Sequence, residues 1–261
     1  MTVVVTDLRE RLAPLMDRVE EAEHVSLCLD FDGTLTPIKT DPEAVSLDDD
    51  VRTILEQLGE TSDLTLAIVS GRGLDDLTDR ISIPGIAYAG NHGLEIHRNG
   101  IHWVHPAVDR TRATLERVRD DLATELEPIP GARVEDKGAT LSVHFRAVEP
   151  AHKSTVVEIT EERAGDIDHI RLESGKAVVQ VRPDISWNKG DAVRLIAPTE
   201  PGTLVVFVGD DRTDVDAFDT LERLEVGTLA IGVGDRSLPG DIHLRDPDEV
   251  STMLTWLAER A

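Results

Sequence analysis

The sequence has little of what several protein classes depend on. Its 261 residues include one cysteine, Cys28, which excludes an intramolecular disulfide framework and a zinc site built from several thiolates. Aromatic residues make up 3%, and three scattered tryptophans are too few for a platform that stacks bases or sugar chains. No apolar run approaches the roughly 18 residues of a membrane span. The first residues lack the basic and apolar parts of a signal peptide, so we expect a cytoplasmic protein.

Positive charge is also scarce, and lysine most of all. Five lysines and 22 arginines face 51 acidic residues, so the net charge is −24. Such a charge repels nucleic acid and anionic membranes, and we expect neither as a partner. It is compatible with a small phosphorylated substrate if the binding site supplies its own positive charge. An acid-rich, lysine-poor surface also fits a cytoplasm of high salt, which screens the self-repulsion.

Short, continuous apolar runs alternate with helical patterns along most of the chain. Runs of this kind are typical of parallel strands that are buried on both faces. The predicted strands are Val25–Asp30, Leu64–Val69, Ile86–Ala89, Leu204–Val208 and Thr228–Val233. Helical stripes are centred on residues 8–19, 51–58, 215–224 and 250–257. The alternation predicts the α/β class, with a Rossmann-like, doubly wound parallel sheet.

The middle of the chain has a different pattern. An alternating run around Asn99-Gly100 predicts a hairpin, and a helix with apolar positions 115–126 follows. Short strands at 133–137, 140–146, 169–173 and 177–182 and a helix at 150–163 come next. We interpret this stretch as an inserted α+β cap domain at 107–182. Residues 1–106 and 183–261 then form a discontinuous core.

The first predicted strand ends in Asp30-Phe31-Asp32-Gly33-Thr34-Leu35-Thr36. Ligands of open α/β sheets bind beyond the carboxyl ends of the strands. Two carboxylates this close need a cation or a shared proton, and an aspartate can also attack phosphorus. A bare Asp-x-Asp pair also occurs in metal-dependent glycosyltransferases and in surface turns. Its place after a buried strand favours a functional site.

Three further motifs follow predicted strands or open helices. Ser70-Gly71-Arg72 can hold a phosphate oxygen, although a plain helix cap explains it equally well. Lys189 opens a helix, where it can neutralise a phosphate, and it can also be a solvated lysine. Gly209-Asp210-Asp211-Arg212-Thr213-Asp214 adds three acids, which either begin a helix or surround a cation. Hard oxygen ligands of this kind select Mg²⁺.

Together these four motifs resemble those of the haloacid dehalogenase superfamily of phosphatases. The inserted block resembles that superfamily's α/β cap. Further stretches are similar to those of trehalose-6-phosphate phosphatases, among them Gly90–Glu95, Val134–Lys137, Val143–Arg146 and Gly175–Pro183. The likeness runs over roughly residues 25 to 257. It implies Mg²⁺-dependent hydrolysis of trehalose 6-phosphate through an aspartyl-phosphate.

The resemblance also implies roles for individual residues. Asp30 is the expected nucleophile and Asp32 the expected acid and base, while Ser70 and Lys189 hold the phosphoryl oxygens. Mg²⁺ is held by Asp30, the backbone carbonyl of Asp32, and Asp210. Asp211 and Asp214 orient a water ligand or Lys189. The expected substrate-binding residues are Thr34, Arg72, His92, Glu95, Glu135, Lys137 and Gln180.

Two positions depart from the family pattern. Gln180 stands where a sugar-binding Glu is expected, and Val215 where an acidic residue is usual. Gln180 keeps the exact sugar open, because a pocket of buried hydrogen bonds discriminates by pairing. The alternatives are a phosphatase or mutase for another glycosyl phosphate, such as a glucosyl- or mannosyl-glycerate phosphate, and a non-catalytic sugar-phosphate sensor or regulatory subunit of a synthase. We expect a monomer, with a trehalose-phosphate synthase as a candidate partner.

Overall fold

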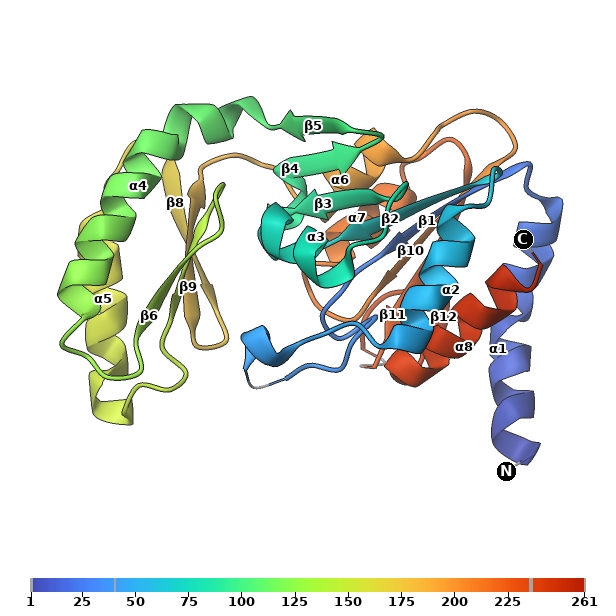
Figure 1. Ribbon diagram of the computed structural model, residues 1–261, viewed down its shortest axis with the longest axis horizontal. Coiled ribbons are helices and arrows are strands. Elements are labelled where there is room, and N and C mark those ends of the chain that lie inside the picture. Colours follow the sequence, from blue (N-terminus) through green and yellow to red (C-terminus); the bar gives the residue numbers. More distant parts are fainter. Residues whose placement is uncertain (1, 40, 235–236, 261) are drawn as a thin grey trace. The chain divides into compact units, whose positions relative to one another are not determined.

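The structure, a computed structural model, describes residues 2–39, 41–234 and 237–260 (Figure 1). Three 3-10 helices lie at Pro42–Ala44, Asn91–Gly93 and Pro150–His152. The strands are β1 (His24–Leu29), β2 (Leu64–Val69), β3 (Ala87–Gly90), β4 (Glu95–Arg98), β5 (Ile101–Val104), β6 (Arg133–Asp136), β7 (Leu141–His144), β8 (Ile170–Gly175), β9 (Val178–Pro183), β10 (Thr203–Gly209), β11 (Gly227–Val233) and β12 (Ile242–Leu244). The α-helices are α1 (Thr2–Glu21), α2 (Asp49–Gly59), α3 (Leu74–Ile81), α4 (Pro106–Leu126), α5 (Lys153–Ala164), α6 (Lys189–Ile196), α7 (Val215–Leu221) and α8 (Pro247–Ala258).

The chain folds into two compact units. The first comprises Met1–Gly71, Asp75–His102 and Trp187–Ala261, and the second comprises Arg72–Leu74 and Trp103–Ser186. The borders expected from the sequence, at Pro106 and Pro183, lie a few residues inside the second unit. The assignment of catalysis to one unit and specificity to the other remains a prediction.

The first unit is built on a sheet in the order β12-β11-β10-β1-β2-β3-β4-β5. The strands from β12 to β3 are parallel, and β4 runs antiparallel to β3. Strand β10 is buried along its whole length, as expected of a parallel strand that is covered on both faces. Strand β12 was not predicted, because three residues are too few to show a periodic pattern. The predicted α/β class with a parallel sheet is confirmed.

The strand order reverses between β1 and β10. From β1 the chain moves to β2 and β3, whereas from β10 it moves the opposite way to β11 and β12. Right-handed crossovers in opposite directions place their helices on opposite faces of the sheet. Such a switch point leaves a crevice at the carboxyl ends of the two central strands. Asp30 and Asp210 are the residues that directly follow these two strands.

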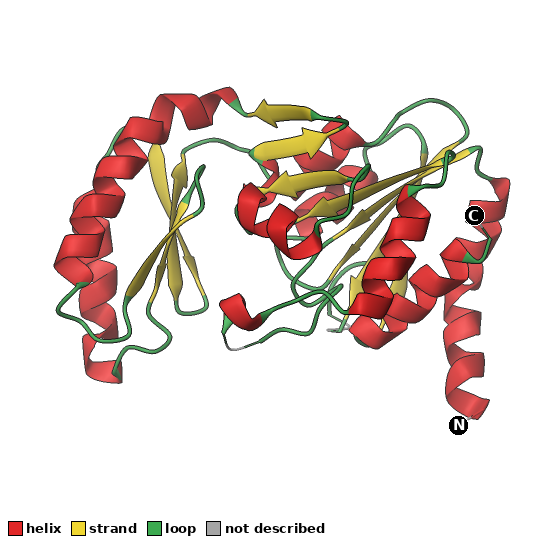
Figure 2. Cartoon of the chain, in the orientation of Figure 1, coloured by secondary structure: helices red, strands yellow, loops and turns green. Residues whose placement is uncertain are grey.

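The second unit is an antiparallel sheet with two helices. Its strand order is β6-β7-β9-β8, and α4 and α5 lie along one face of the sheet (Figure 2). Leu141, Val143 and Val181 point into the core formed with these helices. Because side chains alternate along a strand, the residues between them lie on the opposite face. There Glu135, Ser142, Gln180 and Glu173 form one row across the four strands.

The described residues contain no helix with both the length and the apolar character that a membrane crossing requires. The single thiol, Cys28, is fully buried within β1, as its apolar neighbours predict. Burial raises the pKa of this thiol to about 12, so it stays protonated. Cys28 is therefore a packing residue of the sheet.

The buried carboxylate of Glu249 in α8 forms an ion pair with Arg11 of α1. Glu249 is 7% exposed and accepts hydrogen bonds from both terminal nitrogens of Arg11, at 2.8 and 2.6 Å. It also accepts bonds from the backbone and the side chain of Arg245. Burial alone would raise the pKa of Glu249, but the hydrogen bonds from Arg11 and Arg245 outweigh it and lower the pKa to about 2.

This arrangement predicts a loss of stability for Glu249→Gln. The amide carries no charge for the two arginines, so the free energy of unfolding should fall by about 1–3 kcal/mol at neutral pH. The carboxylate stabilises the wild type fully above its ordinary pKa of 4.5, and this contribution is lost as pH falls toward about 2. Urea unfolding at pH 7 and pH 3 measures both effects. Glu56→Gln, at an exposed site on α2, is the control. An equal loss in both variants would contradict the assignment.

Candidate active site

Asp30 lies at the carboxyl end of β1, next to β10. Its backbone N–H donates to the carbonyl of Val208 at 2.9 Å, so the ladder between the two strands fixes its position. The residue is only 4% exposed. A buried carboxylate is unfavourable unless it is paired, so the neighbours of Asp30 determine what it can do.

The chain turns sharply after Asp30. The backbone N–H groups of Leu35 and Thr36 both donate to the carbonyl of Phe31, which closes the turn. Gly33 has φ +94, and a Cβ there would lie 2.1 Å from a carboxylate oxygen of Asp210. Glycine is therefore required, because the Asp210 carboxylate lies where the Cβ of any other residue would be. Asp32 is half-buried within this turn, and Thr34 is fully buried.

Lys189 begins α6 and carries the central positive charge of the site. A capping box between Asn188 and Asp191 fixes this end of the helix. The Lys189 Nζ donates to Asp30 Oδ1 at 2.7 Å and to Asp214 Oδ1 at 2.6 Å. Lys189 is 3% exposed, so it is not the solvated lysine that the sequence left open as an alternative.

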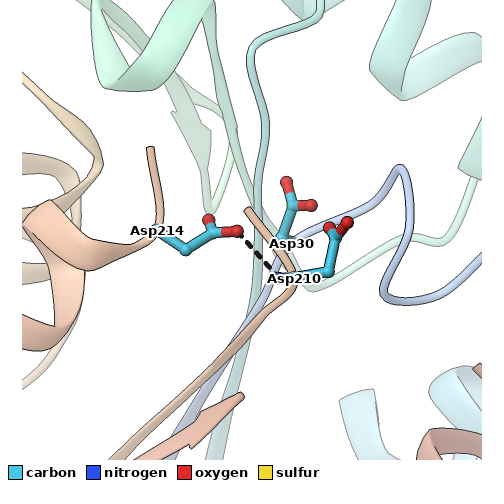
Figure 3. Close-up of side chains that lie close together, drawn as sticks. All are labelled: Asp30, Asp210 and Asp214. Carbon is cyan, nitrogen blue, oxygen red and sulfur yellow. Dashed lines mark hydrogen bonds between the residues drawn. The ribbon is translucent and has the colours of Figure 1, made fainter. Parts of the chain in front are cut away.

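Asp214 is fully buried and organises the loop after β10. Its Oδ1 accepts the bond from Lys189, and its Oδ2 accepts the backbone N–H group of Asp211 at 3.0 Å. The same Oδ2 accepts the backbone N–H of Asp210 at 2.9 Å, which is the dashed line in Figure 3. Asp211 instead bonds the backbone and hydroxyl of Thr213. Asp214 therefore connects the lysine to the loop that presents Asp210.

The site holds more negative than positive charge. Burial raises the pKa of Asp30 well above its ordinary value, Lys189 offsets part of this, and Asp214 and Asp210 raise it further. Burial, with Asp214 and Asp211 nearby, raises the pKa of Asp210 to about 6. Burial alone would lower the pKa of Lys189, but the carboxylates of Asp214 and Asp30 raise it overall, so the lysine stays charged.

These residues fit a divalent cation. Carboxylate oxygens of Asp30, Asp210 and Asp214 lie within 4.8 Å of one another, and all are hard ligands. Both oxygens of Asp214 already accept hydrogen bonds, whereas Asp30 accepts the bond from Lys189 at one oxygen, Oδ1. Asp30 and Asp210 are thus better placed as metal ligands than Asp214. The side chain of Asp32 is not part of the cluster; its expected contribution is a backbone carbonyl.

Ser70 follows β2, and its backbone is held on one side by β3 and on the other by the 3-10 helix that follows β3. Its N–H donates to the carbonyl of Ala89, and its carbonyl accepts the N–H of His92, both at 2.9 Å. The hydroxyl is therefore the Ser70 group that would reach a phosphoryl oxygen. The His92 ring lies against Gly71, where a Cβ would come within 2.7 Å of a ring carbon. Arg72 falls in the second unit, in the loop before α3.

Of the remaining expected substrate contacts, Glu95 lies in the first unit, at the start of β4, and Glu135, Lys137 and Gln180 lie in the second. Glu135 Oε2 is 2.6 Å from His144 Nε2. Burial alone would raise the pKa of Glu135, but the bond with His144 and the charge of Lys137 outweigh it and lower the pKa. Gln180 is half-buried in the same row as Glu135. The face thus carries a paired carboxylate at Glu135 and an uncharged amide at Gln180, with Ser142 between them in the row.

Comparison with known proteins identifies the family. A family model described as trehalose-phosphatase matches residues 28–244, which is most of the chain and includes every acidic residue of the cluster. The chain belongs to the trehalose-phosphatase family. Its α/β fold is that of haloacid dehalogenase-like proteins, as the sequence motifs predicted.

The curated relatives that match lie at moderate identity. The trehalose-phosphate phosphatase of Mycobacterium leprae is 34% identical over 254 residues, which cover 92% of this chain and 58% of that protein. Trehalose-phosphate phosphatase B of Arabidopsis thaliana is 30% identical, and the match covers 92% of this chain and 67% of the relative. The chain thus spans 58% of the length of the first relative and 67% of the length of the second.

Solved structures agree with the fold. The crystal structure of a trehalose-6-phosphate phosphatase related protein superposes with a TM-score of 0.80 at 26% identity, covering 90% of this chain and 97% of that one. The C-terminal domain of the Candida albicans trehalose-6-phosphate phosphatase gives 0.75 at 26% identity, with 94% and 96% covered. A haloacid dehalogenase-like hydrolase from Bacteroides thetaiotaomicron shares the fold alone, at 14% identity and 0.62.

Two side chains beside the expected residues received no role from the sequence. Asn91 is fully buried and donates to Glu95, and His144 pairs with Glu135. Both lie within stretches that resemble the family, but a motif match does not show which neighbour a side chain contacts. The antiparallel register of β6 and β7 places His144 opposite Arg133, so Glu135 is its diagonal neighbour, two residues further along β6 on the same face.

Proposed function

We propose that the chain is a phosphatase that hydrolyses trehalose 6-phosphate to trehalose and phosphate, with Asp30 as nucleophile. Membership of the trehalose-phosphatase family supports the substrate class. The observation that carries the mechanism is the bridge from Lys189 to Asp30 and Asp214, at 2.7 and 2.6 Å, at the switch point of the sheet. A buried cation beside a buried carboxylate suits the transfer of a phosphoryl group to that carboxylate.

In the first half-reaction, a carboxylate oxygen of Asp30 attacks phosphorus. The bond between phosphorus and the sugar oxygen breaks, and Asp32 donates a proton to that oxygen as it leaves. Lys189 and the Ser70 hydroxyl hold the other phosphoryl oxygens. The products at this stage are the free sugar and an aspartyl-phosphate on Asp30.

In the second half-reaction, water attacks the same phosphorus. Asp32, which is now a carboxylate, takes a proton from the water, and the bond between phosphorus and Asp30 breaks. This restores the protonation of both residues and releases phosphate. Lys189 keeps its charge throughout, because Asp214 and Asp30 raise its pKa.

The acidic cluster supports Mg²⁺ as the cofactor. Asp30, Asp210 and the backbone carbonyl of Asp32 would hold it, and Asp211 and Asp214 would position these groups. When bound, the cation offsets the excess negative charge of the two carboxylates and of the phosphoryl group.

We assign recognition of the sugar to His92 in the first unit and to Glu135, Lys137 and Gln180 in the second. Thr34 and Arg72 are further candidate contacts to the substrate. Because Gln180 lacks a charge that a Glu would carry, another glycosyl phosphate is the alternative substrate. We place the reaction in the cytoplasm, with a trehalose-phosphate synthase as the candidate partner.

A panel of sugar phosphates tests the proposal. Phosphate release is measured with Mg²⁺, with EDTA, and with EDTA followed by excess Mg²⁺. We expect Mg²⁺-dependent release from trehalose 6-phosphate at least about tenfold faster than from glucose 6-phosphate, a difference of about 1.4 kcal/mol in the barrier. Faster release from another glycosyl phosphate would overturn the substrate and direct attention to Gln180. Binding without release from any member would favour a sugar-phosphate sensor.

A further inference from the structure

The loop between β3 and β4 has an unusual backbone. Asn91, His92 and Gly93 follow one another with φ values of 51, 57 and 90, all in the left-handed region. Residues other than glycine rarely adopt this backbone conformation, and two consecutive ones in it need support from their surroundings. The loop is short, because Gly90 and Glu95 on either side of it already pair across the two strands.

A side-chain hydrogen bond closes the loop. Asn91 is fully buried, and its Nδ2 donates to Glu95 Oε2 at 2.7 Å. Leu94, also fully buried, donates its backbone N–H to the carbonyl of Asn91 at 3.3 Å. The bond from Asn91 to Glu95 thus joins the residue that begins the left-handed stretch to the residue that resumes the strand.

The loop sets the position of the Ser70 motif in two ways. The N–H of His92, the second left-handed residue, donates to the Ser70 carbonyl at 2.9 Å. The His92 ring occupies the space beside Gly71, where a Cβ would lie 2.7 and 2.8 Å from ring atoms. A shift of the loop would therefore move both the backbone and the neighbour of the residue whose hydroxyl meets the phosphoryl group.

We infer that Asn91 and Glu95 are a pair of positioning residues, and that their hydrogen bond holds the left-handed loop which places Ser70 and His92 for catalysis. The inference rests on the proposed function for its chemistry. It changes the role of Glu95, which the family likeness assigned to the sugar. Its Oε2 accepts the bond from Asn91 and its Oε1 lies 3.9 Å from His102 Nε2, so both oxygens face side chains of its own hairpin. We therefore assign its contribution to the phosphoryl subsite, where it applies to any phosphate ester.

Exchanging donor and acceptor tests the pair. Asn91→Asp places two carboxylates together and should lower kcat/KM by about 10- to 100-fold, as expected when a reacting group is displaced by about 1 Å. Glu95→Gln keeps an acceptor oxygen and should lose little. The double variant N91D/E95Q reverses the direction of the hydrogen bond, because the new amide at position 95 can donate to the new carboxylate at position 91. It should regain most of the loss. Asn99→Asp is the matched control, since Asn99 also has a positive φ but lies exposed in the next turn.

Two substrates and one background variant separate positioning from other roles. Loss of similar size on trehalose 6-phosphate and on p-nitrophenyl phosphate supports positioning, whereas loss on the sugar phosphate alone would make Glu95 a sugar contact and overturn the inference. In a Ser70→Ala background, N91D should lower the rate much less than in the wild type. The inference would also be overturned if the rate losses from N91D and Ser70→Ala were additive. It would likewise be overturned if N91D/E95Q were no faster than N91D.

Two further measurements cover failure to fold and failure of the proposed function. Asn91→Gly keeps the left-handed backbone without the amide, so it should show the same loss if N91D does not fold. If the wild type cleaves the aryl phosphate but not trehalose 6-phosphate, the proposed substrate is wrong and the pair is still judged on the aryl ester. If the wild type cleaves neither, calorimetry with inorganic phosphate and Mg²⁺ decides, and unchanged phosphate affinity in N91D would overturn the inference.

Discussion

Asp30→Asn should abolish phosphate release while leaving the protein folded. The amide is a poor nucleophile for phosphorus, and loss of a covalent nucleophile lowers kcat by about 10,000-fold or more. The change also removes one of the carboxylates that crowd Lys189, and the amide oxygen can still accept its hydrogen bond. We therefore expect a thermal unfolding temperature equal to or above that of the wild type in EDTA.

Asp219→Asn provides the control for this prediction. Asp219 is exposed on α7, and its substitution should leave both phosphate release and the unfolding temperature unchanged. Turnover by Asp30→Asn at more than a few per cent of the wild-type rate would remove Asp30 from the role of nucleophile. The carboxylates left to consider would then be Asp32 and Asp210.

The second large effect is on stability, from Lys189→Met. The substitution keeps most of the side-chain volume but leaves Asp30 and Asp214 buried without their cation. Removing one partner of a buried ion pair lowers the free energy of unfolding by about 3–5 kcal/mol. If Lys189 holds phosphoryl oxygens as we propose, the substitution should also lower kcat by about 100- to 1,000-fold.

This loss of stability should depend on pH. Burial already raises the pKa values of Asp30 and Asp214 in the folded state, and the charge of Lys189 lowers both. Without Lys189, the two pKa values therefore rise further. A carboxyl whose pKa is raised by folding destabilises the protein above its unfolded pKa, and the penalty shrinks as pH falls toward that value. Urea unfolding in EDTA should therefore show a larger deficit at pH 8 than at pH 5.

The exposed Lys176→Met is the matched control for this series. It removes the same charge from the surface and should change the free energy of unfolding by no more than about 0.5 kcal/mol. A pH-independent deficit in Lys189→Met would point to a packing defect instead of unpaired carboxylates. If the variant does not fold at pH 8, recovery of a cooperative transition at pH 5 supports the same account.

The sequence predicted the parts of the site that depend on a single strand and the turn after it. Strand β10 is a continuous apolar run that is buried along its length, and such a run ending in Gly209-Asp210-Asp211 indicates both the strand and its chemistry. Asp30 follows β1 in the same way. Because carboxyl ends of neighbouring parallel strands share one edge, these acids could be placed together from the sequence alone.

Other features of the site depend on contacts that no local pattern reveals. The 2.6 Å contact between Lys189 and Asp214 joins α6 to the loop after β10, and only the packing of the fold selects Asp214 over Asp211. The left-handed turn at Asn91 and His92 is equally hidden, since neither residue type requires a positive φ. The assignment of Glu95 to the sugar followed from likeness, whereas its bond to Asn91, four residues earlier, is visible only once the loop between β3 and β4 is folded.

The most direct measurement is the trapping of the phosphoryl group on Asp30. The protein is mixed with trehalose 6-phosphate and Mg²⁺, quenched in acid within the first turnovers, and digested for peptide mass spectrometry. We predict a gain of one phosphoryl group on the peptide that contains Asp30, absent in Asp30→Asn and absent when EDTA replaces Mg²⁺. Rapid phosphate release with no phosphorylated peptide at any quench time, or with the group on another residue, would contradict the account.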